Sequence, residues 1–152
     1  MTRLEDELSG EGARIFGGRW NSPGHACLYC AASLELALLE TLVHLDLDLI
    51  PADVLAIELD VPDQDVAHPS VVLPEDWDAP PPYSSAAQQI GDAWLQSRSS
   101  VACALPSSVL PLRSNVLMNP EHPSFAQVRI VERKPMQWPR RLLAHLGSLR
   151  MS

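Results

Sequence analysis

Two features of the chain have the residue types of an anion-binding catalytic site. The first is the segment Gly17-Gly18-Arg19-Trp20-Asn21-Ser22-Pro23-Gly24, in which an arginine stands between glycines and a tryptophan. Glycines let the backbone approach a ligand closely, and the planar guanidinium of arginine recognises phosphate oxygens. The second is Glu40, a carboxylate within an otherwise apolar stretch. Together they predict a cleft for an anionic substrate.

The stretch around Glu40 predicts a helix from Leu34 to Leu47 with Ser33 as its N-cap. At 100° per residue, Glu40 and His44 lie one turn apart on the same face. Leucines cover two flanks of this helix, so its polar face is expected to line either a cleft or a buried partner. The alternative is a buried Glu40–Arg19 or Glu40–His44 pair that only holds the core.

Three cysteines, Cys27, Cys30 and Cys103, raise the question of redox or metal chemistry. The Cys27-x-x-Cys30 spacing before a helix resembles a redox dithiol or half of a zinc site. We expect no metal site, because no second pair of ligands stands at zinc spacing. In a strand the two thiols would point to opposite faces. This favours the interpretation that the cysteines are simply small buried apolar residues. An odd number of cysteines without a secretory signal indicates reduced thiols.

Ser107 directly follows a predicted strand, so its hydroxyl is placed to point into a cleft. No Gly-x-Ser-x-Gly elbow surrounds it, so we expect no hydrolase-type nucleophile, and a simple turn serine is the alternative. Gly10-x-Gly12 follows no strand, which excludes a dinucleotide fingerprint. The residues alone therefore indicate an anion-binding cleft of Arg, Tyr, Glu and Ser.

The elements that must position these residues predict an α+β fold. Expected strands lie at 27–30, 54–61, 100–105, 114–118 and 125–132. Expected helices lie at 34–47, from Ser84 or Ser85 to about Gln96, and after Pro139. Residues 1–14 are expected to be irregular, and the Pro- and Asp-rich residues 62–82 to form an ordered lid or edge cover. A regular βαβ rhythm is missing, which favours α+β over a doubly wound sheet.

The composition limits the class of protein. A chain of 152 residues is most simply one domain, 1–152, that can bury a core without disulfides or metal. The net charge of -8 argues against a nucleic-acid-binding surface. No apolar run approaches the ~20 residues that span a bilayer, so we expect a cytoplasmic protein without a membrane partner.

Several segments in this order resemble the RES domain, the toxin half of RES–Xre toxin–antitoxin pairs. The matching text is Ser9-Gly10-Glu11-Gly12-Ala13, Gly17 to Gly24, Tyr29, Leu36 to Leu45, Leu105-Pro106-Ser107, and Asn115 to Pro123. The resemblance covers about residues 9–132. Family members usually carry a strand with an aromatic-Arg-Ile-like segment before the first motif. Only Met1 to Leu8 precede it here, so we expect that strand to be shortened or altered.

The resemblance implies a compact fold like the NAD-binding core of ADP-ribosylating toxins, with NAD as the substrate. It implies cleavage of the nicotinamide–ribose bond and transfer of ADP-ribose to a protein, such as a phosphoribosyl pyrophosphate synthetase. The alternatives are an NAD glycohydrolase or phosphorylase and a non-catalytic nucleotide- or partner-binding module. The implied partner is an Xre-like helix-turn-helix antitoxin, which would carry the DNA-binding function, and a homodimer is expected by analogy.

The resemblance also assigns site residues. Arg19, Glu40 and Ser107 take the places of the family's arginine, glutamate and serine, and Tyr29 that of its pocket tyrosine. Arg19 would hold the pyrophosphate, and Tyr29 would wall the nicotinamide ring. Ser107 would position the nicotinamide ribose, while Glu40 would stabilise the positive charge that develops as nicotinamide leaves. His44 and Asn115 are further candidates for binding NAD.

Overall fold

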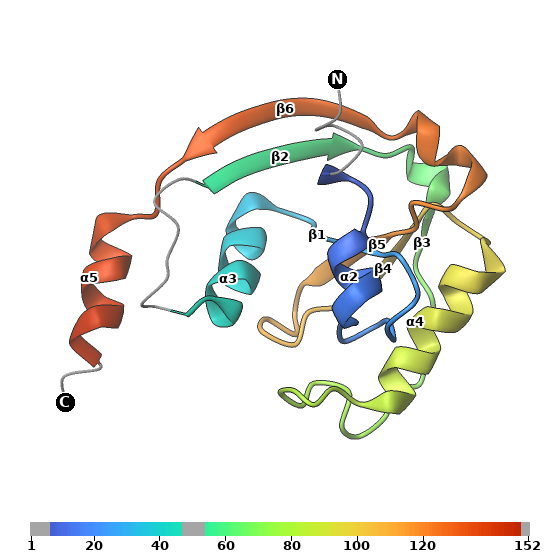
Figure 1. Ribbon diagram of the computed structural model, residues 1–152, viewed down its shortest axis with the longest axis horizontal. Helices are drawn as coiled ribbons and strands as arrows, with labels where there is room; N and C mark the ends of the chain where they lie inside the picture. The colour runs from blue at the N-terminus through green and yellow to red at the C-terminus, as the bar shows by residue number, and fades with distance from the viewer. Residues whose placement is uncertain (1–6, 47–53, 150–152) are drawn as a thin grey trace.

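A four-stranded mixed sheet forms the centre of the computed structural model, which describes residues 7–46 and 54–149 (Figure 1). Its strand order is β1-β5-β4-β3. The strands span Leu28–Ala31 in β1, Ser114–Met118 in β5, Ala102–Pro106 in β4 and Val66–Ala67 in β3. β5 pairs antiparallel with both of its neighbours, and the short edge strand β3 runs parallel to β4.

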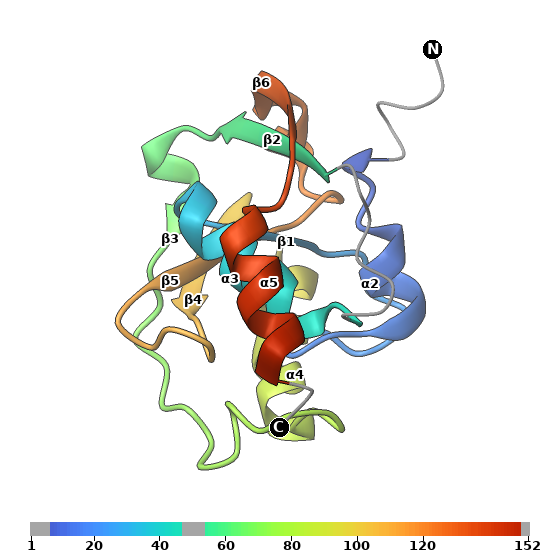
Figure 2. The same cartoon turned by 90° about the vertical axis from the view of Figure 1, so that its left-hand side faces the viewer.

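A second sheet of two antiparallel strands arches over the first (Figure 1). β2 covers Val54–Asp60 and β6 covers Arg129–Met136, with a register shift between Glu58 and Leu59. Such a bulge bends and twists a strand pair, which fits the arched course of both strands. Figure 2 shows the pair above the helices and above the four-stranded sheet.

Four α-helices and two 3-10 helices complete the described fold. The α-helices are α2 (Glu11–Phe16), α3 (Leu34–His44), α4 (Ser85–Ser97) and α5 (Arg140–Leu149), and the 3-10 helices are η1 (Asp63–Asp65) and η2 (Pro123–Gln127). The side chain of Ser33 caps α3 by accepting the Leu36 N–H, and that of Ser84 caps α4 by accepting the Ala87 N–H. α4 and α5 lie at opposite ends of the molecule (Figure 1).

The four-stranded sheet buries both of its faces. One face packs with Trp20 and the buried residues of α4, and includes Cys103, Leu105 and Leu117. The other face packs Ala102 and Met118 under the arched pair, whose Leu59 joins this cluster. A strand covered on both sides has apolar residues at consecutive positions instead of a polar–apolar alternation. The first four of the five residues of β4 are apolar.

The α+β class predicted from the sequence is confirmed. Strands β1, β2, β4 and β5 lie within a residue or two of their predicted ranges, and Ser84 caps α4 as one of its two predicted caps. Residues 62–82 include the sheet's short edge strand β3, which pairs with β4. Within the described residues, no helix is both long and apolar enough to cross a bilayer.

Three predictions of local structure are wrong. Residues 11–16 form the helix α2 instead of an irregular lead-in, because Gly10 adopts positive φ before it and Gly17 ends it the same way. α3 ends at His44, since Leu45 turns to extended backbone; the predicted end at Leu47 lies outside the described residues. Residues 123–127 form η2, so the last strand begins only at Arg129. Most of Met1 to Leu8 also lies outside the described residues.

Candidate active site

A cavity of about 470 Å³ lies where α2, β1, β5 and α3 meet. This volume falls within the range of small-molecule sites in proteins. Its wall includes backbone from the glycine-rich segment and the polar face of α3. The polar and aromatic side chains on the wall are Phe16, Arg19, Trp20, Tyr29, Glu40, Thr41, His44, Tyr83, Ser108 and Asn115.

The carboxylate of Glu40 is held from the sheet side by two donors. The Ser107 hydroxyl donates to Oε1 of Glu40 at 2.5 Å, and Nδ2 of Asn115 donates to the same oxygen at 2.6 Å. Oε2 accepts no hydrogen bond from the described residues. Two donors on one oxygen fix the carboxylate's orientation and leave the other oxygen for a ligand.

Ser107 lies behind Glu40 and not on the cavity wall. It is fully buried. Its Oγ accepts hydrogen bonds from the backbone N–H of Val109 at 3.1 Å and of Leu110 at 2.8 Å, while it donates to Glu40. The hydroxyl therefore both closes the turn after β4 and holds the carboxylate. Ser107 is thus a turn serine, as one of the two interpretations had it, and it also lies next to a residue of the cavity wall.

The side-chain amide of Asn115 has its nitrogen hydrogen-bonded and its oxygen without a partner among the described residues. Glu40 offers only acceptors, so the bond to Oε1 requires Nδ2 of Asn115 to face the carboxylate. Oδ1 then faces away; it is buried and has no hydrogen-bond partner among the described residues. A buried acceptor without a donor is uncommon and costs free energy.

Arg19 reaches the cavity from the glycine-rich segment. Its Nη1 donates to the backbone oxygen of Trp77 at 2.6 Å and to that of Ala79 at 2.9 Å. The guanidinium carbon stands 5.2 Å from the centre of the Tyr83 ring. Carbonyl and aromatic partners hold the group without cancelling its positive charge.

Tyr29 lies directly against the backbone of Gly18. Its hydroxyl accepts from the Trp20 N–H at 2.9 Å and donates to Oδ1 of Asn21 at 2.7 Å. A Cβ on Gly18 would stand 2.6 Å from the hydroxyl oxygen, so a side chain there would collide with Tyr29. Burial of the hydroxyl raises the pKa of Tyr29 above its ordinary value, so it stays a neutral phenol. The ring, 42% exposed as a residue, contributes to the wall.

The pairing of Glu40 with Arg19 or His44 in the core is not observed. Arg19 bonds to carbonyls and Glu40 to Ser107 and Asn115, and no ion pair joins these residues within the described part of the chain. His44 stands exposed at the end of α3 and lines the cavity. The structure thus brings Arg19, Tyr29, Glu40, His44 and Asn115 to one wall, with Ser107 behind it.

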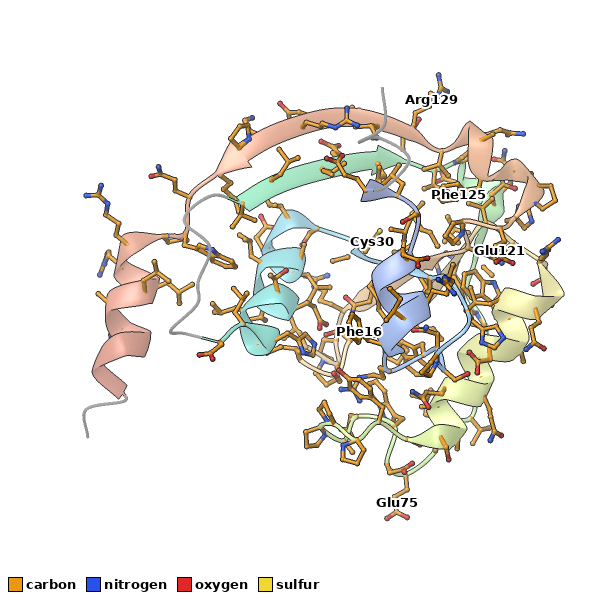
Figure 3. The ribbon with its side chains drawn as sticks, in the orientation of Figure 1. Phe16, Cys30, Glu75, Glu121, Phe125 and Arg129 are labelled. Carbon is orange, nitrogen blue, oxygen red and sulfur yellow. The ribbon has the colours of Figure 1, made fainter. Side chains whose placement is uncertain are left out.

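Sequence reasoning missed three residues of the wall. Phe16 is 82% exposed and lies near the lower end of α2 (Figure 3), Tyr83 stacks with Arg19, and Ser108 follows Ser107. The unpredicted helix α2 positions Phe16, and the connection before α4 positions Tyr83. Of these three residues, only Ser108 could have been suspected from the sequence, because it is next to Ser107.

The cysteines are free thiols. Cys27 is buried, whereas Cys30 reaches the cavity wall and stands 3.7 Å from the sulfur of Met118. Burial raises the pKa of Cys30 to about 11 and also raises that of Cys27, so neither is an activated thiolate. Among the described residues, no three His, Cys, Asp or Glu side chains gather as metal ligands would.

The fold and the wall define an α+β protein with an arginine and an oriented glutamate at one cavity. Residues 2–139 match the family described as the RES domain. The chain therefore belongs to the RES domain family.

Known proteins similar to this chain include bacterial toxins. A protein of Sphingobium sp. (strain YBL2) named "Prs ADP-ribosylating toxin" is 39% identical over 137 residues, covering 88% of this chain and 83% of that protein. A "Toxin Res" of Photorhabdus laumondii is 36% identical over 123 residues, covering 80% of this chain and 78% of the relative. A chain of the M. tuberculosis MbcT–MbcA toxin–antitoxin complex shares the fold, with a TM-score of 0.65, 20% identity, and coverage of 100% of this chain and 86% of its own.

Proposed function

We propose that this chain is the NAD-consuming toxin of a bacterial toxin–antitoxin pair, acting as one cytoplasmic domain over residues 1–152. It cleaves the bond between nicotinamide and ribose and transfers ADP-ribose to a protein acceptor. The observation that carries the proposal is the doubly held Glu40 carboxylate on a cavity that also contains Arg19. Relatives named as toxins, one of them as an ADP-ribosylating toxin, support it.

In the proposed reaction, the bond between C1′ of the ribose and the ring nitrogen of nicotinamide breaks. Its electron pair leaves with nicotinamide, which becomes neutral, so no general acid is required. The ribose carbon gains positive charge, which the Glu40 carboxylate stabilises because it is already oriented when the charge develops. The acceptor then adds its lone pair to C1′ and releases its proton.

The other predicted site residues have proposed tasks that follow from their chemistry. Arg19 binds the pyrophosphate, and the Tyr29 ring packs against nicotinamide. Ser107 and Asn115 hold Glu40, and Oδ1 of Asn115 accepts from a ligand hydroxyl or amide after a small rearrangement. His44 stands one turn beyond Glu40 at the cavity mouth, where it contacts the ribose or the incoming acceptor.

For the acceptor we propose phosphoribosyl pyrophosphate synthetase, in keeping with the name of the Sphingobium relative. An Xre-like antitoxin is proposed to neutralise the toxin, and two copies of the chain to form a homodimer. NAD hydrolysis or phosphorolysis is the second candidate, because α3 leaves His44 and Thr41 exposed at the cavity, where water has access.

The test follows both halves of NAD. The purified protein is incubated with NAD labelled in its adenylate phosphate, with and without phosphoribosyl pyrophosphate synthetase or a bacterial lysate. Free nicotinamide together with label on a protein band supports the transferase. Free nicotinamide with only soluble ADP-ribose, or its phosphate ester, supports NAD degradation instead. No nicotinamide in any condition, from folded protein, favours a non-catalytic binding module.

A further inference from the structure

Arg19 divides its hydrogen-bond donors into two sets. Both Nη1 hydrogens go to carbonyl oxygens, those of Trp77 and Ala79. The Nε–H and the two Nη2 hydrogens have no partner among the described residues. Nε–H and one Nη2–H point in parallel from the same edge of the guanidinium, the arrangement that binds two oxygens of one anion. The side chain is therefore held at one edge and open at the other.

The carbonyls that hold Arg19 belong to residues 74–79, which we call the Arg19 clamp. Two turns shape the clamp, because the Trp77 N–H donates to the Pro74 oxygen at 3.2 Å and the Ala79 N–H to the Asp76 oxygen at 3.1 Å. These turns direct both carbonyl oxygens toward the same nitrogen of Arg19.

The clamp is anchored to the core by two adjacent residues, Asp76 and Trp77. The Trp77 ring stacks on buried Trp20, with ring centroids 5.8 Å apart and 24° between the planes. Oδ1 of Asp76 accepts the Ser84 hydroxyl at 2.7 Å, and Ser84 is the buried cap of α4. The clamp is thus tied to the residue next to Arg19 and to the start of α4.

Among the described residues, no ion pair joins Arg19 to the acidic residues of the clamp, Glu75, Asp76 and Asp78. Glu75 projects from the clamp away from the body of the molecule (Figure 3), and the Asp76 carboxylate is engaged with Ser84. Neutral carbonyls orient a guanidinium without offsetting its charge, whereas a carboxylate partner would compete with a bound anion. Arg19 thereby keeps its full charge for a ligand.

We propose that the clamp is a positioning device that presents the Nε–Nη2 edge of Arg19 to a pyrophosphate, so that the cavity selects dinucleotide pyrophosphates over nucleosides. The proposal rests on the proposed function, in which Arg19 binds the pyrophosphate of NAD. It gives residues 74–79 a role that their sequence does not show: Trp77 acts on the ligand only through Arg19.

The test measures binding of ADP-ribose, which carries the pyrophosphate but no cleavable nicotinamide bond, by titration calorimetry. Four proteins form a cycle: wild type, Trp77→Ala, Arg19→Ala and the double variant. We expect about tenfold weaker binding for Trp77→Ala and about 100-fold for Arg19→Ala, with no further loss in the double variant. Val72→Ala is the matched control, since Val72 is 94% exposed on the same connection.

The proposal is overturned if the two losses multiply in the double variant, or if folded Trp77→Ala binds as wild type does. Trp77→Phe should restore most of the affinity, because a phenyl ring still stacks on Trp20. If Trp77→Ala does not fold, Asp76→Ala replaces it in the cycle, with Asp76→Asn as the variant that keeps an acceptor for Ser84. If the wild-type protein neither binds ADP-ribose nor releases nicotinamide, the proposed function is refuted. If it does both, a failed prediction for the Trp77 variants refutes only the proposal about the clamp.

Discussion

The hydroxyl of Ser107 donates a hydrogen bond at 2.5 Å to Oε1 of Glu40, a residue 67 positions earlier in the chain. This contact joins the turn after β4 to the middle of α3. Ser107 is buried and does not line the cavity, so we propose that it acts on a ligand only through Glu40. In this proposal Glu40 contacts the substrate, and Ser107 positions Glu40.

Replacing Ser107 should reduce both stability and activity. Ser107→Ala removes a donor to Glu40 and leaves the N–H groups of Val109 and Leu110 without their acceptor. These hydrogen bonds are part-buried and each contributes about 0.5–1.5 kcal/mol, so we expect a loss of about 1–3 kcal/mol in the free energy of unfolding. With the carboxylate less fixed, nicotinamide release should slow about 10- to 100-fold. Urea unfolding and initial rates at saturating NAD measure the two effects.

Ser108→Ala is the control for that experiment. Ser108 lines the cavity but makes no hydrogen bond to Glu40. Its substitution should leave the free energy of unfolding within about 0.5 kcal/mol of wild type. Equal losses of stability in the two variants would mean that the hydrogen bonds of Ser107 do not stabilise the fold.

Two glycines in helices should respond in opposite directions to alanine. A Cβ on Gly91 in α4 would stand 1.7 Å from the backbone oxygen of Trp20, so Gly91→Ala forces α4 away from the segment that carries Arg19. We expect a loss of more than about 3 kcal/mol, or no folded protein. A Cβ on Gly12 in α2 would meet no atom within 4 Å. Gly12→Ala should stabilise the protein by about 0.5–1 kcal/mol, because alanine is the better helix former.

Thermal and urea unfolding of the two glycine variants test this contrast. A folded Gly91→Ala protein with wild-type stability would show that α4 does not pack closely on the Trp20 backbone. Such a result would also remove the basis for a fixed Arg19 segment.

Alkaline pH should destabilise the fold through its thiols. Burial raises the pKa of Cys103 to about 11, as it does for Cys30, whereas an unfolded thiol titrates near ~8.5. The unfolded state therefore loses protons first as the pH rises. The stabilising contribution is complete below about pH 8.5 and is lost progressively up to about pH 11. Each thiol lowers the free energy of unfolding by at most about 1.4 kcal/mol per pH unit in this range.

Urea unfolding between pH 8 and 11, with a reductant present, measures this loss. Cys103→Ala should give a shallower decline than wild type, because one titrating thiol is gone. An unchanged slope would mean that the Cys103 thiol does not keep its proton in the folded state.

Local patterns in the sequence predicted the elements that they control. The Ser33 cap and the apolar run that follows identified α3, and Ser84 was one of the two predicted caps of α4. The α2 helix was missed because six residues between two glycines give too short a pattern to be recognised. Phe125 and Val128 looked like strand residues, but the His122 ring accepts the Ser124 N–H and starts a 3-10 turn before β6.

The site was predictable as residue types but not as contacts. Arg19 and Glu40 were expected to share a cleft, and both line one cavity. The partners that orient them come from distant parts of the chain: Trp77 and Ala79 for Arg19, Asn115 for Glu40. Backbone carbonyls carry no sequence signature, so no pattern could have indicated the clamp.

The most direct test of the proposed mechanism compares nicotinamide release from NAD by wild type and by Glu40→Gln. Glutamine keeps the size of the side chain and an acceptor oxygen for Ser107 and Asn115, but removes the negative charge. We predict that wild type releases nicotinamide and that Glu40→Gln, with an unchanged melting temperature, does so about 10²- to 10³-fold more slowly. Equal rates for the two folded proteins would contradict the proposed role of Glu40.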